Sequence, residues 1–151
     1  ERETASPAPV RVRVEGLPRP RFAYAVQVQD AGGDGMLDAG ETATVIVDVR
    51  NVGRGPALRV LSTLRNPEQE SGINIRKGRE RIDGGIPVDG TVQARFRVEV
   101  RPDRQPGPAA LEIAILDTRL REFLSEKIAL DVGPAGRTFP REPASPWRVA
   151  G

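Results

Sequence analysis

The sequence has no cysteine and no histidine, and aromatic residues make up only 4% of its 151 positions. Without cysteine, the chain can form no disulfide, thiolate zinc site or thiol nucleophile. Without histidine, it has no imidazole general base, and a Ser–His–Asp triad cannot be assembled. Any catalysis would need carboxylates, lysine or a carboxylate-bound metal. We therefore predict that this chain is not itself an enzyme.

Long hydrophobic runs are also missing. No segment approaches the roughly 20 apolar residues that a membrane-spanning helix needs, so no membrane span is predicted. The charge is nearly balanced, with 23 basic and 21 acidic residues. Nucleic-acid binding favours a concentrated basic stripe with stacking aromatics, whereas the arginines here are scattered, so we expect no nucleic-acid partner.

What the chain does have is alternation of apolar and polar residues, the pattern of half-buried β-strands. The most regular example is Thr91–Arg101, where Val92, Ala94, Phe96, Val98 and Val100 share one face. Glycine and proline turns separate the alternating segments. Further strands are predicted around 10–14, 22–29, 42–50, 58–64, 111–115 and 128–132, with a short edge strand at 73–75.

Seven or so short strands predict an all-β fold, an immunoglobulin-like antiparallel β-sandwich. We assign residues 16–133 to the sandwich. Residues 1–15 are predicted to be a linker with a candidate leading strand, and residues 134–151 a proline-rich tail or linker. The apolar residues of 116–128 also fit helical spacing, but two alternating runs flank 117–121, which favours a hairpin there.

One loop carries acidic residues at metal-ligand spacing. In Asp30–Glu41 (DAGGDGMLDAGE), the acids Asp30, Asp34, Asp38 and Glu41 fall at positions 1, 5, 9 and 12 of a calcium loop. Position 3 is Gly32, which offers no side-chain ligand, and strands rather than helices flank the loop. The sequence thus leaves two interpretations open: a calcium site, or a hairpin loop whose carboxylates cap backbone N–H groups. A carboxylate-based hydrolase using Asp30, Asp34 and Asp38 is disfavoured because no pocket is indicated.

Two other features suggest interaction surfaces. Arg95, Arg97 and Arg101 share the polar face of one predicted strand, which suits either an acidic partner or ordinary solubilising charge; the second interpretation is favoured. Trp147 is the only tryptophan. It could anchor the tail on a neighbouring surface, fold back on the sandwich, or belong to the start of a following domain.

Several segments resemble a known family. These are GDGMLDAGE (Gly33–Glu41), TATVIVDVRNVGRGPALRV (Thr42–Val60) and IPVDGTVQARFRVEV (Ile86–Val100). They are similar to the CARDB-like, immunoglobulin-type domains of exported bacterial proteins, over roughly Phe22–Val132. The resemblance implies a sandwich fold, export, and an accessory role beside a catalytic domain such as a carboxyl-terminal processing-type peptidase. The matching residues are turn residues, so no catalytic role is carried over.

Two functional hypotheses follow. The first is a non-catalytic accessory module that packs against, or recruits protein to, a neighbouring domain of a larger exported protein. The second is an adhesion or ligand-binding module whose acidic loop is stabilised by calcium.

Overall fold

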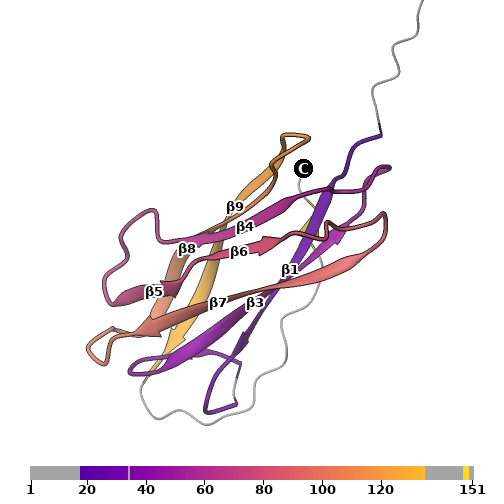
Figure 1. Cartoon of the computed structure of the whole chain (residues 1–151). Coiled ribbons are helices and arrows are strands. Elements are labelled where there is room, and N and C mark those ends of the chain that lie inside the picture. Colours follow the sequence, from indigo (N-terminus) through magenta and orange to yellow (C-terminus); the bar gives the residue numbers. More distant parts are fainter. Residues whose placement is uncertain (1–17, 34, 135–147, 150–151) are drawn as a thin grey trace, which may run out of the picture.

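The computed structural model describes residues 18–33, 35–134 and 148–149, and within them the chain forms ten strands and no helix. The strands build two five-stranded sheets that pack face to face (Figure 1). The predicted all-β sandwich is therefore confirmed. The predicted leading strand at 10–14 lies outside the described residues.

The first sheet is antiparallel throughout. In spatial order it contains β10 (Arg148–Val149), β1 (Phe22–Gln29), β3 (Thr42–Asn51), β7 (Thr91–Val100) and β5 (Ile73–Lys77). The predicted position of β5 at a sheet edge is confirmed.

The second sheet is antiparallel except at one short pair. Its order is β2 (Leu37–Asp38), β9 (Glu122–Gly133), β8 (Gly107–Asp117), β4 (Val60–Arg65) and β6 (Arg79–Ile82). Strand β2 runs parallel to the end of β9, with Leu37 opposite Val132 and Asp38 opposite Gly133. This two-residue pair is the one parallel contact between the described strands of the sandwich.

The core lies between the sheets, where the apolar positions of each strand face inward. On β7, Ala94, Phe96, Val98 and Val100 are buried, while Arg95 and Arg97 are exposed. Strand β8 shows the same alternation, with Leu111, Ile113 and Ile115 fully buried. Alternation at every second residue is what lets two sheets remove their inner faces from water.

Three strands are missing from the sequence prediction, so the expected number of about seven is too low. Strands β2 and β10 contain two residues each, too few to show a period of two. Strand β6 is the sequence RERI, of which only Ile82 is buried. Two residues of the segment predicted as a tail form β10, because β1 offers backbone groups at Ala23 and Tyr24 to pair with them.

The segment between β8 and β9 is a tight hairpin, as predicted, and not a helix. Asp117 pairs with Glu122, and the turn between them closes with a hydrogen bond from the Arg121 N–H to the Asp117 carbonyl. The helical propensity of the residues here is outweighed by the long run of β8–β9 strand pairing that leads into the turn.

The loops gather at the two ends of the sandwich. One end carries the loop between β1 and β3, which contains β2, and also the end of β9. The other end carries the start of β1, the end of β3 and the β8–β9 hairpin. These are called the acidic-loop end and the hairpin end below.

Candidate metal site

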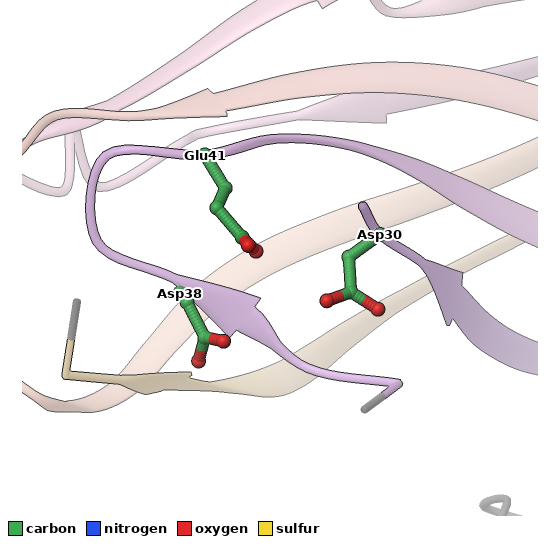
Figure 2. Close-up of side chains that lie close together, drawn as sticks. All are labelled: Asp30, Asp38 and Glu41. Carbon is green, nitrogen blue, oxygen red and sulfur yellow. The ribbon is translucent and has the colours of Figure 1, made fainter. Parts of the chain in front are cut away.

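Three of the four acidic residues predicted as calcium ligands come together at the acidic-loop end. Asp30 follows the last residue of β1, Asp38 lies in β2, and Glu41 immediately precedes β3 (Figure 2). Asp34 lies outside the described residues. The described part of the chain contains no other group of three carboxylates that could hold a metal ion.

Backbone pairing holds the loop in place from both sheets. Leu37 is fully buried in the core, so it fixes the adjacent Asp38 beside the end of β9. The Gly40 N–H donates to the Val100 carbonyl, and the Val100 N–H donates to the Glu41 carbonyl. These bonds fasten the last part of the loop to β7, so Glu41 has little freedom to move away.

Glycine permits the tight turns of the loop. Gly33, Gly35 and Gly40 all have positive φ, near +72°, +72° and +85°. The Gly35 N–H donates to the Asp30 Oδ1 atom at 3.1 Å, a bond between side chain and backbone that spans five residues of the loop. The capping role that the sequence offered as the alternative to metal binding is therefore real for one oxygen of Asp30, and the other oxygen remains for a different ligand.

The spacing of the carboxylates suits one divalent ion. One oxygen from each of Asp30, Asp38 and Glu41 lies within 4.8 Å of the others. Calcium bonds to oxygen at about 2.3 to 2.6 Å, so ligands on opposite sides of one ion are about 4.6 to 5.2 Å apart. A single calcium ion could therefore contact all three side chains without a large rearrangement.

Burial makes this cluster unusual for a surface loop. The Asp38 side chain is completely inaccessible to solvent, and Asp30 and Glu41 are partly buried. The second carboxylate oxygen of Asp30 is buried and has no hydrogen-bond partner within the described residues. Two negative charges about 4.8 Å apart repel by roughly 3 to 4 kcal/mol at an effective dielectric constant near 20. A bound divalent cation would offset that repulsion for all three pairs.

The arginines predicted as an interaction surface are spread along the outer face of β7 and just beyond it. Arg95 donates to the Gln93 side chain at 2.9 Å, and Arg101, which follows the strand, pairs with Asp103 at 3.1 Å. The nearby Glu99 pairs with Arg76 at 2.7 Å. Arg97 is exposed on the same face. The face therefore carries both signs of charge, and docking of an acidic partner stays a prediction. Trp147 lies outside the described residues.

Two structural residues at the hairpin end were not singled out from the sequence. Both Asn51 and Asp117 are buried polar side chains with 0% exposure. Asn51 donates to the Gly55 and Ile86 carbonyls at 2.8 and 3.0 Å. Asp117 accepts from the backbone N–H groups of Leu58, Arg119 and Leu120. The only sequence signal is that each ends an alternating run at a turn.

Comparison with known proteins adds one finding. No protein-family model and no curated protein matches the sequence. Twenty solved chains match the structure. One is the CARDB domain of a Pyrococcus furiosus protein, crystallised in complex with di-metal ions, with 14% identity and a TM-score of 0.46 over 82% of this chain and 97% of that one. The likeness is one of fold. The family of this neighbour is the one that the sequence resembles.

Proposed function

We propose that this chain is a non-catalytic accessory β-sandwich module of a larger exported protein, and that its acidic loop binds calcium through Asp30, Asp38 and Glu41 with Asp34. The observation that carries the calcium site is the convergence, within 4.8 Å, of three carboxylates that lie just after β1, in β2 and just before β3. The absence of cysteine and histidine from the sequence supports a non-catalytic role. The described residues contain no helix that could cross a membrane.

The proposed ion would join the two sheets. Asp30 and Glu41 are attached to β1 and β3 of the first sheet, whereas Asp38 belongs to β2 of the second. A cation bound by all three would therefore close the sandwich at the acidic-loop end. Its effect would be to stiffen that end against separation of the sheets, which suits a module that must present a fixed surface to a neighbour.

The test is thermal unfolding of the whole chain with and without calcium. An ion that binds only the folded state stabilises it by RT ln(1 + [L]/Kd), about 2.7 kcal/mol at 100 times Kd. For a domain of this size that corresponds to a rise in Tm of roughly 5 to 10 °C. Magnesium at the same concentration should give a smaller rise, since it demands shorter bonds and near-octahedral geometry.

Two variants sharpen this test. Asp30→Asn should abolish the calcium response, yet without calcium it should be at least as stable as the wild type, because one repulsive charge is gone while the Asn Oδ1 atom can still accept from Gly35. Asp48→Asn removes an acid from the outer face of β3 and should respond to calcium like the wild type. Unchanged melting of the wild type in millimolar calcium would refute the site.

The accessory role has a separate test. Deleting residues 18–149 from the full-length parent should impair its activity, localisation or substrate recruitment. An unchanged parent would remove the support for this part of the proposal, whatever the outcome of the calcium experiment.

A further inference from the structure

The outer face of the second sheet carries an apolar row at the hairpin end. Leu61 on β4 pairs with Leu116 on β8, which in turn pairs with Phe123 on β9. Their sequence neighbours Ser62, Ile115 and Leu124 are buried, so these three side chains point outward. Phe123 is 63% exposed, the highest value among the large hydrophobic residues described as exposed.

Toward the middle of the sheet the apolar row has no charged neighbour on β4, β8 or β9. At the β6 edge the row ends at Arg81, which is exposed and pairs with Leu61. The next row toward the middle of the sheet is Thr63, Ala114 and Ser125. Charged pairs begin only one row further, with Arg65–Glu112 at 2.5 Å and Lys127–Glu68 at 2.8 Å. The outer face of β7 in the other sheet is charged throughout its middle. One sheet therefore has a solvated outer face, and the other has an apolar end suited to being covered.

The chain enters the described structure beside this row. Arg19 contacts the Glu122 carboxylate and the Leu120 carbonyl, so the polypeptide is fastened next to Phe123. A hollow of about 340 Å³ lies there, lined by Arg19–Phe22 and Glu122–Leu124. The described chain therefore begins at the edge of the apolar row, and the 17 residues before Pro18 lie outside the described residues.

That preceding segment has a complementary pattern. Val10, Val12 and Val14 alternate with Arg11 and Arg13. Arg19 lies five positions after Val14, which gives a reach of roughly 16 Å in an extended chain. The row from β9 across β8 to β4 spans only about 10 Å, since neighbouring strands are about 4.8 Å apart. The segment is therefore long enough to reach every member of the row.

We propose that the Val10–Val14 segment docks on the apolar row, placing its valines against Phe123, Leu116 and Leu61 and its arginines in solvent. The inference does not depend on the calcium site. A docked segment would set the direction in which the chain leaves the sandwich, and hence where anything attached before it is held.

Limited proteolysis of the full chain tests this proposal. Trypsin cuts after Arg11 and Arg13, and docking should protect both bonds. In Phe123→Ser, cleavage at these two bonds should become at least five-fold faster relative to cleavage after Arg137 in the same sample. Val88→Ser is the matched control: Val88 is another exposed apolar residue at the hairpin end, at 42%, but it lies outside the row. Its cleavage rates should equal those of the wild type.

Three results would overturn the proposal. Equal cleavage rates in the wild type and Phe123→Ser would show that the row does not hold the segment. Protection that grows with protein concentration, with a matching increase in mass by light scattering, would assign the row to a second copy of the chain. Loss of protection in Val88→Ser as well would indicate general loosening of the end. Thermal melting of both variants verifies that they fold.

Discussion

Asn51 holds several loops together at the hairpin end. Its amide donates to the Gly55 and Ile86 carbonyls, and its oxygen accepts from the Arg21 and Gly53 N–H groups at 3.2 and 3.0 Å. All of its hydrogen-bonding groups are used, as a fully buried side chain requires. One residue thereby joins the start of β1, the turn after β3 and the segment before β7.

Replacing Asn51 should be costly, and the type of replacement should matter. Asn51→Ala leaves buried backbone groups without partners, for which we expect a loss of about 2 to 4 kcal/mol in the free energy of unfolding. Asn51→Asp should be worse at pH 7, because a carboxylate would face two carbonyl oxygens. Urea denaturation measures both. An Asn51→Asp variant as stable as the alanine variant would contradict this account.

Asp117 also holds backbone segments together at the hairpin end, but it does so as an ionised carboxylate. Burial raises the pKa of Asp117, but hydrogen bonds from the Leu120, Leu58 and Arg119 backbone favour the ionised form more strongly and leave the pKa below its ordinary value. An acid whose pKa is lowered in the folded state stabilises the protein above its unfolded pKa, near 3.9. That stability is lost as the pH falls through the folded pKa.

Because the pKa of Asp117 is lowered by folding, the stability lost in Asp117→Asn should depend on pH. At pH 7 the variant should be less stable than the wild type by about 2 to 3 kcal/mol, because an amide cannot accept as many N–H groups. The difference should begin to shrink below about pH 4, where Asp117 of the unfolded wild type takes up a proton, and should keep shrinking until the pH has fallen through the lowered pKa of the folded state. Denaturant unfolding between pH 7 and 3 measures it. A difference that stays constant over this range would count against the proposed role.

Among the elements, the turn after β6 contains two adjacent glycines with different constraints. Gly85 has φ near +72°, and a Cβ placed there would lie 2.3 Å from the Ala57 carbonyl oxygen. That carbonyl accepts from Ile86, in the bridge that joins this turn to the segment before β4. Gly84 has nothing within 4 Å of an added Cβ.

The glycine pair gives a matched comparison. Gly85→Ala should destabilise the chain by about 2 kcal/mol or more, because it combines strained φ with a backbone clash. Gly84→Ala should be neutral or stabilising by up to about 1 kcal/mol, since it restricts the unfolded chain without a clash. Thermal unfolding of the two single variants suffices. Equal changes in stability for the two variants would show that the Ala57 carbonyl does not restrict which residue can occupy position 85.

Long strands could be predicted from sequence and short ones could not, for a physical reason. Strand β7 buries every second residue from Ala94 to Val100 and strand β8 every second residue from Ala109 to Asp117, so the alternation is unmistakable. Strand β2 exists because Leu37 is drawn into the core and its backbone meets β9, which is a tertiary contact. Strand β6 exists because it pairs with β4 at an edge, where only one inward residue is needed.

For the whole molecule, the sequence singled out the acidic residues of the candidate site but not their arrangement. The spacing of Asp30, Asp38 and Glu41 suggested one loop around one ion. The structure places Asp38 in a strand of the second sheet and Asp30 and Glu41 next to strands of the first, an arrangement that the linear spacing does not contain. The proposal that calcium joins the two sheets comes from this topology. The buried network around Asn51 escaped prediction for the same reason, because its partners are far apart in sequence.

The most direct test of the proposal that calcium joins the two sheets is a crystal structure of the full chain grown in millimolar calcium. We expect one ion bonded to oxygens of Asp30, Asp38 and Glu41 at about 2.3 to 2.6 Å, with Asp34 contributing from the loop. An ion bound elsewhere, or these three carboxylates with no ion between them at that concentration, would contradict the proposal that calcium joins the two sheets.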